Sequence, residues 1–166
     1  MGLPVVTGTT GWYEKIEQIE SKICEKVGVL YGSNFSIGVN LVFNLLANFS
    51  EQIAKPKIYD AVCIETHHKW KKDSPSGTAK EICNIVNKKF LSSDSEIPCC
   101  SARFGNVIGK HEVIFDSEFD DIAIIHNAKN RDGFALGAVL GAGWLVGKKG
   151  IFNFKDEFTN IMNFAG

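Results

Sequence analysis

The 166-residue sequence predicts an α/β fold in which a small parallel sheet is followed by an α+β region with a mixed sheet. The first 35 residues show a strand, an amphipathic helix and a second strand, which is typical of a parallel βαβ unit. Residues 36–150 then combine long helical patterns with alternating apolar strands. The composition, 45% hydrophobic with a net charge of −1, provides a buried core and excludes both a disordered tail and a strongly basic nucleic-acid-binding protein.

The first region opens with a strand over residues 3–7, which the turn Gly8-Thr9-Thr10-Gly11 ends. Apolar residues at helical spacing follow, and a second strand over residues 27–31 ends at Gly32-Ser33-Asn34. Two parallel strands are too few for a stable sheet. We therefore expect this region to be the end of a larger domain. The helical positions are Ile16, Ile19, Ile23, Cys24 and Val27.

The second region begins with a helix that Ser36 caps and Pro56 ends. A polar connection over residues 65–76 separates the first strand of this region from the next helix. A turn of two glycines and two lysines, residues 147–150, then precedes a short terminal helix. The other expected elements are strands over residues 58–64, 107–115 and 122–125, and helices over residues 78–90, 133–146 and 154–164.

The five cysteines are odd in number and irregularly spaced, and no Cys-x-x-Cys pair occurs. This pattern favours reduced thiols in a cytoplasmic protein, with neither a disulfide framework nor a structural zinc site. The amino-terminal residues lack the basic and apolar segments of a signal peptide. The most apolar stretch, residues 134–146, is too short to cross a bilayer, so no membrane association is expected.

Reactive side chains are concentrated between residues 65 and 79, where a strand gives way to a helix. His67 and His68 are suited to proton transfer near neutral pH, and Lys71 adds a positive charge. The free N–H groups of a helix opening at Ser76-Gly77-Thr78 are suited to a carboxylate or phosphate. Together they predict a site for a small anionic substrate that also needs a proton.

Less specific roles for these residues remain open. The two histidines could lie on a surface loop, and Ser76-Gly77-Thr78 could be ordinary capping chemistry. Zinc binding by Cys63, His67 and His68, or a metal-dependent hydrolase using Glu65 with the two histidines, is less favoured because adjacent residues on extended backbone point to opposite faces. We expect structural roles for His111 and His126. A specific ion pair or interface is expected for Arg103 and Arg131, the two arginines of the chain.

The run from Glu65 to Ala79 resembles the signature of dihydrodipicolinate reductase (4-hydroxy-tetrahydrodipicolinate reductase), a nicotinamide-dependent enzyme of lysine biosynthesis. Four shorter motifs resemble that family in the same order. They are Gly8-Thr9-Thr10-Gly11, Ser33-Asn34-Phe35-Ser36, the segment Arg103 to Glu112, and Asn130-Arg131-Asp132-Gly133-Phe134-Ala135.

The resemblance implies hydride transfer from NADPH or NADH to a cyclic imine dicarboxylate, in a cytoplasmic homo-oligomer, expected to be a tetramer. His67 would be the general acid and Lys71 its partner, and a substrate carboxylate would bind His68, Gly77 and Thr78. The cofactor would contact Gly8, Thr9, Thr10, Gly32, Ser33, Asn34 and Phe35. No metal, nucleic acid or membrane is implied.

The chain departs from the family at its beginning, because it contains no Gly-x-x-Gly-x-Met-Gly fingerprint for the cofactor pyrophosphate. We expect residues 1–35 to be the carboxyl-terminal part of a Rossmann-type dinucleotide-binding domain. Residues 36–150 would form the substrate-binding and oligomerisation domain, and residues 151–166 would return to the first domain. The alternative is a non-catalytic remnant that retains only the oligomerising sheet of the family.

Overall fold

The computed structural model describes residues 2–23, 26–90 and 96–166, and it divides into two compact units. The first unit comprises Met1–Asn40 and Asp132–Gly166, and the second comprises Leu41–Arg131. Within the described residues, no helix is long and apolar enough to cross a membrane. Each unit has its own sheet and its own apolar core.

The first unit contains a three-stranded parallel sheet of order β1-β2-β7. The predicted parallel pairing of β1 (Val5–Thr7) with β2 (Gly28–Tyr31) is confirmed. Helix α1 (Ile16–Ile23) follows a single 3-10 turn (Tyr13–Lys15) and is shorter than expected, since Val27 lies outside it, while Cys24 lies outside the described residues. Helix α5 spans Phe158–Ala165.

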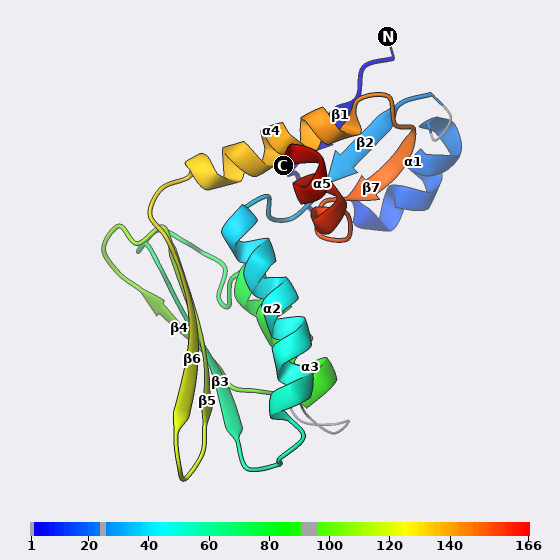
Figure 1. Ribbon diagram of the computed structural model, residues 1–166. Coiled ribbons are helices and arrows are strands. Elements are labelled where there is room, and N and C mark those ends of the chain that lie inside the picture. The colour runs from blue at the N-terminus through cyan, green and yellow to red at the C-terminus, as the bar shows by residue number, and fades with distance from the viewer. Residues whose placement is uncertain (1, 24–25, 91–95) are drawn as a thin grey trace. The chain divides into compact units, whose positions relative to one another are not determined.

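Strand β7 (Gly150–Asn153) was not predicted, because four residues after a glycine turn carry little periodicity. It pairs with β2, more than a hundred residues earlier in the chain, and so completes the sheet. The order of elements can be followed in Figure 1, where β7 is orange beside the blue β2. The small sheet therefore has three strands rather than the two expected from the sequence.

Helix α4 (Asp132–Leu145) belongs to the first unit, not to the second as the expected boundary of residues 36–150 implied. Its glycines explain the difference. A Cβ at Gly137 would overlap the carbonyl oxygen of Phe35, and a Cβ at Gly141 would lie 2.5 Å from Leu30 Cδ2. The bare helix face thus lets the backbone pack closely on the first unit. The core of this unit comprises Leu30, Phe35, Trp144, Leu145, Phe154, Phe158 and Ile161.

The second unit is built on a four-stranded mixed sheet of order β4-β3-β5-β6, and the predicted mixed sheet is confirmed. Strands β3 and β4 are parallel, and the other pairs are antiparallel. Helix α2 (Ile37–Ile53), which begins in the first unit, is capped as expected, since Val39 N donates to Ser36 Oγ at 3.3 Å. The remaining elements are β3 (Asp60–His67), α3 (Gly77–Phe90), β4 (Cys99–Arg103), β5 (Gly109–Asp116) and β6 (Asp121–Ala128).

Two differences from the predicted strands affect the site. Strand β3 continues to His67, although the sequence predicted a polar connection from Glu65 onward. Strand β4 was not predicted, because an edge strand with partly exposed, polar residues has no apolar alternation. The end of β3 gains its backbone hydrogen bonds from β4 and β5, and β4 pairs with β3 alone; sequence periodicity does not predict such pairing.

The sheet of the second unit has one covered face and one open face. Helices α2 and α3 lie against the covered face (Figure 1), where the Phe115 ring packs 5.4 Å from Phe49 and 5.5 Å from Phe90. Alternate residues of β3 and β5 are buried there. The open face carries the intervening residues, among them Ile64, Ile114 and the half-exposed Ile125.

Candidate active site

The end of strand β3 places two reactive side chains on the covered face of the sheet. Residues alternate along the strand, so Cys63, Glu65 and His67 share that face and are all buried. Glu65 is paired in register with Ser101 of β4 and with His111 of β5, and His111 is paired with His126 of β6. The register therefore brings four polar residues from four strands into one row.

Glu65 is the centre of the site and is fully buried. Its Oε1 accepts hydrogen bonds from the Arg103 guanidinium at 2.6 Å, from Ser101 Oγ at 2.7 Å and from Ser76 N at 3.2 Å. Its other oxygen, Oε2, forms an ion-pair contact with Nδ1 of His67. A buried carboxylate held in this way has a fixed position and orients both the arginine and the histidine.

These contacts determine the charge of Glu65. Burial by itself would raise the pKa of the carboxyl group, but the hydrogen bonds from Arg103, Ser101 and the Ser76 backbone outweigh burial and lower the pKa to about 2. The carboxylate is therefore negative at neutral pH. The Arg103 side chain also donates to the carbonyl of Asp73 at 2.8 Å, so it links the sheet to the connection before α3.

His67 lies between Glu65 and two neighbouring elements. Its ring stands edge-on to the His111 ring at 5.1 Å, and a Cβ at Gly109 would be 3.1 Å from its Nε2. Burial lowers the pKa of His67 and the Glu65 charge opposes this, while the positive charges of Lys71 and Arg103 lower it further. The neutral imidazole is thus favoured at neutral pH in the free chain, with Nδ1 facing the carboxylate.

Ser76 connects the row of polar residues to the start of helix α3. Its hydroxyl accepts from Ala79 N at 3.2 Å, which caps the helix, and lies 3.2 Å from His111 Nε2. Burial, reinforced by the nearby His67, lowers the pKa of His111 to about 4, so this ring is neutral at neutral pH. The expected structural role of His111 agrees with these contacts, and they also place it beside His67.

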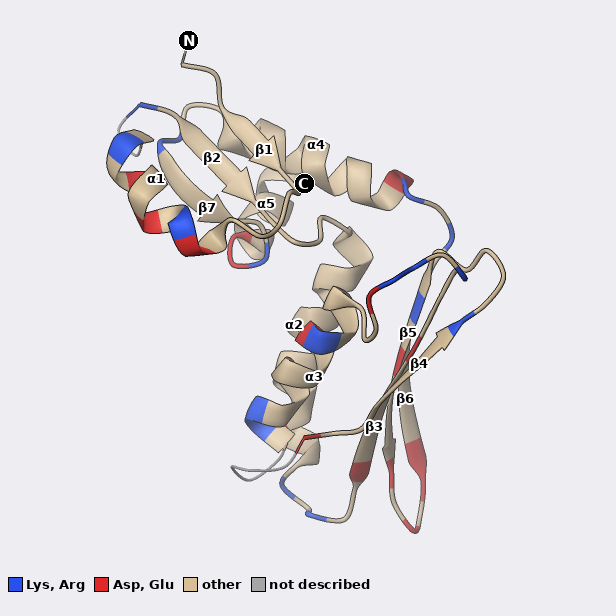
Figure 2. Cartoon of the chain, turned by 180° about the vertical axis from the view of Figure 1, so that it is seen from behind, with Lys and Arg blue, Asp and Glu red and all other residues tan. Residues whose placement is uncertain are grey.

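The start of α3 combines an exposed helix terminus with basic side chains. A Cβ at Gly77 would meet no atom within 4 Å, so the space over this residue is open. Lys71 Nζ is paired with Asp73 at 2.9 Å, and its side chain is only about a quarter exposed. Figure 2 shows blue residues around this end of the sheet and red residues at the opposite end, where β3 begins at Asp60 and β5 ends at Asp116. The electrostatic field at this helix terminus favours an anion.

The structure brings some of the predicted residues together and separates others. His67 joins Glu65, whereas His68, on the opposite face of the backbone, contacts the Trp70 ring at 5.8 Å. The group that could chelate a metal through His67 consists of Glu65, His67 and His111, so neither Cys63 nor His68 completes the zinc or hydrolase sites considered above. The expected specific ion pair of Arg103 is confirmed.

Sequence reasoning missed Ser101, and it did not identify Glu65 as the centre of the site or Ser76 and Arg103 as donors to its carboxylate. Ser101 and Arg103 are far from Glu65 in the chain and meet it only through the pairing of β3 with β4. The alternation Cys63, Glu65, His67 was the available signal, because it continues the buried face of the preceding strand.

The residues predicted to contact a cofactor lie in the first unit, in the two loops that follow the carboxyl ends of β1 and β2. Gly8 and Gly32 both approach the Phe35 ring, with Cβ positions 3.8 Å and 3.5 Å from it. Thr9 N donates to Thr7 Oγ1 at 3.2 Å, and Ser36 N donates to the Asn34 side chain at 2.9 Å. Parallel sheets bind ligands at this edge.

The fold and the site define an α/β protein with one parallel-sheet unit and one mixed-sheet unit that carries a buried carboxylate–histidine pair beside a basic helix terminus. A family model described as "Dihydrodipicolinate reductase, C-terminus" matches residues 38–158. The chain belongs to the dihydrodipicolinate reductase family, as the sequence motifs indicated.

Curated relatives agree with this assignment. The chain is 40% identical over 171 residues to the 4-hydroxy-tetrahydrodipicolinate reductase of Christiangramia forsetii, with 96% of this chain and 71% of the relative covered. It is 41% identical over 160 residues to the enzyme of that name from Wigglesworthia glossinidia brevipalpis, covering 96% and 58%. The corresponding enzyme of Buchnera aphidicola from Cinara cedri is 33% identical, covering 95% and 63%. The chain thus spans about three fifths to seven tenths of its relatives' length.

A solved structure supports the fold. The dipicolinate-bound dihydrodipicolinate reductase from Paenisporosarcina sp. TG-14 superimposes with a TM-score of 0.70 at 23% identity, over 91% of this chain and 63% of that one. The match extends over both units of the chain, and it confirms the predicted α/β class.

Proposed function

We propose that this chain contributes to the NAD(P)H-dependent reduction of a cyclic imine dicarboxylate to tetrahydrodipicolinate, a proposal supported by the name 4-hydroxy-tetrahydrodipicolinate reductase that its relatives carry. The observation that carries the proposal is the buried Glu65–His67 pair beside the basic start of α3. This arrangement supplies a proton-transfer group and an anion-binding surface within one unit. The proposed pathway is lysine and diaminopimelate biosynthesis in the cytoplasm.

His67 is the proposed proton donor. When bound, a nicotinamide cofactor would supply the hydride, and the reduced substrate would then need a proton on carbon. Glu65 holds the imidazole by its Nδ1, which leaves Nε2 for the substrate. Lys71 and Arg103 oppose protonation of His67 in the free chain, so a dianionic substrate that neutralises these charges raises the pKa of His67 when it binds.

Lys71, His68, Gly77 and Thr78 are the proposed substrate contacts. The open space over Gly77 allows a carboxylate to approach the helix backbone closely, and the helix terminus favours its charge. Lys71 exchanges its exposed partner Asp73 for a second carboxylate. Two anion-binding groups beside one proton donor are suited to a substrate with two carboxylates and one reacting carbon.

The first unit provides the proposed cofactor contacts through Gly8, Thr9, Thr10, Gly32, Ser33, Asn34 and Phe35. The loops after β1 and β2 are anchored on the buried Phe35 ring, to which Gly8 and Gly32 both lie close. They are suited to the nicotinamide end of the cofactor. No fingerprint for the pyrophosphate occurs in the 166 residues, and the preference between NADH and NADPH is left to experiment.

Self-association through the open face of the second sheet is the proposed quaternary contact, with a homotetramer as the expected assembly. Ile64, Ile114 and Ile125 lie on this face, which no helix of the second unit covers in the part of the chain that the structure describes. A partner sheet would bury these side chains. The same observation supports the second candidate function, a non-catalytic chain that retains only this oligomerising sheet.

Cofactor titration and turnover separate the two candidates. The 166-residue chain is titrated with NADPH and NADH by fluorescence and assayed for reduction of the cyclic imine. The same measurements are made on a fusion that supplies the glycine fingerprint of a relative. We expect weak binding and little turnover by the chain alone, because several charge-assisted hydrogen bonds to the pyrophosphate, each worth about 1.5–3 kcal/mol, are missing.

The fusion is expected to restore both cofactor binding and turnover. A fusion that binds cofactor tightly but does not reduce the imine would contradict the reductase proposal and favour the non-catalytic one. Sedimentation at micromolar concentration tests the assembly in the same samples, and a monomer would contradict the proposed contact between open faces.

A further inference from the structure

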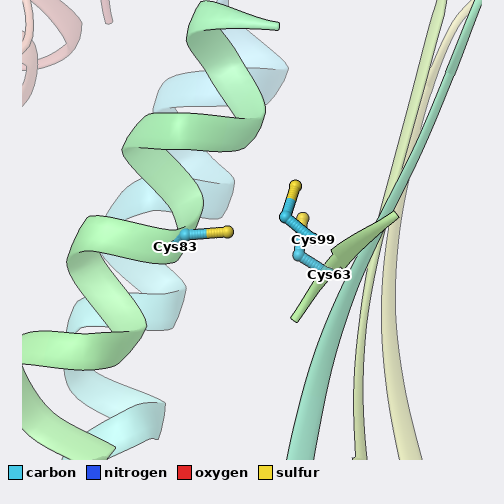
Figure 3. Close-up of side chains that lie close together, drawn as sticks. All are labelled: Cys63, Cys83 and Cys99. Carbon is cyan, nitrogen blue, oxygen red and sulfur yellow. The ribbon is translucent and has the colours of Figure 1, made fainter. Parts of the chain in front are cut away.

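Three cysteines from three separate elements converge between the sheet and helix α3 of the second unit. Cys63 lies on β3, Cys99 on β4 and Cys83 on α3, and Figure 3 shows the Cys83 side chain extending from the helix toward the two strand cysteines. All three are free thiols, and their sulfur atoms lie within 4.8 Å of one another. Cys63 and Cys99 are also register partners on the parallel strands.

The spacing of these sulfur atoms is close to that of a metal–thiolate site. A metal–sulfur distance of about 2.3 Å places three ligand sulfurs about 3.8–4.0 Å apart, so closure requires movements of about 1 Å or less. Such movements are within the range of cysteine side-chain rotation on a fixed backbone. The three thiols also interact electrostatically with one another.

The residues around the three cysteines indicate which class of metal ion would bind. Cys63 is fully buried and pairs across the sheet with the buried Val113, while Ile82 and Val86 of α3 bury their side chains beside Cys83. This apolar setting, with sulfur as the available ligand, favours a soft ion over magnesium or calcium. Cys83 and Cys99 are partly exposed, which provides a route of entry.

We propose that Cys63, Cys83 and Cys99 bind one thiophilic d¹⁰ cation, Zn²⁺ or Cu(I), that joins β3 and β4 to α3. No fourth ligand joins the three sulfurs among the described residues, so the ion is three-coordinate or takes one ligand from solution. Three-coordination suits Cu(I), and a solvent ligand completes the tetrahedron of Zn²⁺. This site is separate from the Glu65–His67 pair, although Cys63 lies two residues before Glu65 on the same face.

A metal site, a packed thiol cluster and a disulfide differ in how the three cysteines behave. Three thiols can pack as small apolar side chains without binding anything. A disulfide would join two of the sulfurs and leave the third free. In the metal site, all three thiols change together when one ion binds, and this is the property to measure.

The experiment uses the 166-residue chain, reduced and stripped with a chelator, and titrated separately with Zn²⁺, Cu(I) and Mg²⁺ against a competing chromophoric chelator. We expect one equivalent of Zn²⁺ or Cu(I) to bind, and Mg²⁺ to leave the protein unchanged. Cd²⁺ serves as a reporter through its ultraviolet thiolate charge-transfer band. In the folded chain, Zn²⁺ or Cu(I) should slow maleimide labelling of the partly exposed Cys83 and Cys99, while the exposed Cys100 should be labelled at the same rate with and without metal.

Matched variants identify the ligands. Cys83→Ser and Cys99→Ser should each weaken binding by more than about 100-fold, since loss of a ligand exceeds the effect of losing an outer-shell partner. Cys100→Ser is the control, because Cys100 is the exposed neighbour of Cys99 on the same strand and lies outside the cluster. Its affinity should equal that of the unmodified chain.

Several results would overturn the proposal. These are the failure of both Zn²⁺ and Cu(I) to bind at one equivalent, a Cys100→Ser chain that loses as much affinity as Cys83→Ser, and labelling of Cys83 and Cys99 at the same rate with and without metal. If a serine variant fails to fold, the unmodified chain still decides through the metal-dependent slowing of labelling at Cys83 and Cys99 and the metal-dependent rise in its melting temperature.

Discussion

Two neighbouring pairs of residues on the β3–β4 ladder occupy equivalent positions and use different chemistry. Cys63 is paired with Cys99, and two residues later Glu65 is paired with Ser101, so both pairs are on the covered face beside α3. The Glu65 carboxylate accepts hydrogen bonds from Ser101 and Arg103, whereas the thiols interact mainly with one another. The backbone therefore provides two similar positions that differ in their side chains. The Glu65–Ser101 position already carries a negative charge, and the Cys63–Cys99 position is suited to bind a cation.

The two pairs should therefore differ in how much folding stability is lost when one member is substituted. Removing one partner from a buried charged network leaves an uncompensated charge, while shortening a thiol in an apolar setting removes only packing. The following experiments test this difference, starting with the effect on the proposed reaction.

The largest effect is expected for His67→Gln, which removes the proposed proton donor. In the fusion that carries a glycine fingerprint, this change should lower kcat by about two to four orders of magnitude. Steady-state kinetics with the cyclic imine provide the measurement. His68→Gln is the matched control and should act mainly on KM, while Lys71→Ala should affect both kcat and KM. A His67→Gln enzyme with normal turnover would mean that another group donates the proton.

Glu65→Gln is expected to destabilise the fold by about 3 kcal/mol or more, because it leaves the Arg103 guanidinium without its buried counter-charge. The control is Glu112→Gln on β5, whose carboxylate pairs with Lys110 at 2.9 Å in a more exposed setting and should contribute about 1 kcal/mol or less. Urea unfolding at pH 7 measures both. Equal losses for the two variants would refute the special role of the Glu65 network.

Acidification should destabilise the second unit between about pH 6.5 and pH 4. The pKa of His111 is about 4 in the folded chain against 6.5 for an ordinary histidine, so the unfolded chain takes up its proton first as the pH falls. The stabilising effect of the neutral ring is complete above pH 6.5, and up to about 3 kcal/mol is lost by pH 4. The free energy of unfolding, measured across this range, should fall less steeply in His111→Gln. An unchanged slope would show that His111 does not contribute.

The smallest effect is expected for Cys83→Ala in the metal-free chain, about 1 kcal/mol or less, since a partly exposed thiol behaves as a small apolar side chain. Thermal unfolding in the presence of a chelator measures it. A loss as large as that of Glu65→Gln would show that contacts among the thiols stabilise the fold as strongly as the carboxylate network does.

The sequence alone predicted those parts of the fold and of the candidate site that depend on local signals. Strong local signals identified the βαβ start, the Ser36 cap, helix α3 and the strands β5 and β6, because periodicity and capping depend on neighbouring residues. The motif from Glu65 to Ala79 identified the family and placed the candidate proton donor. These features are encoded over short stretches of neighbouring residues.

Only the tertiary structure decided which strands pair and which distant side chains meet. Strands β4 and β7 are short and lack a clear pattern, and they form because β3 and β2 offer unpaired backbone groups. The glycines of α4 allow the close backbone contact that places this helix in the first unit, and amino-acid composition does not predict that contact. The Glu65 network and the Cys63–Cys83–Cys99 cluster join residues 11 to 38 positions apart, and they meet because of strand register and the packing of α3 on the sheet, both of which are non-local properties.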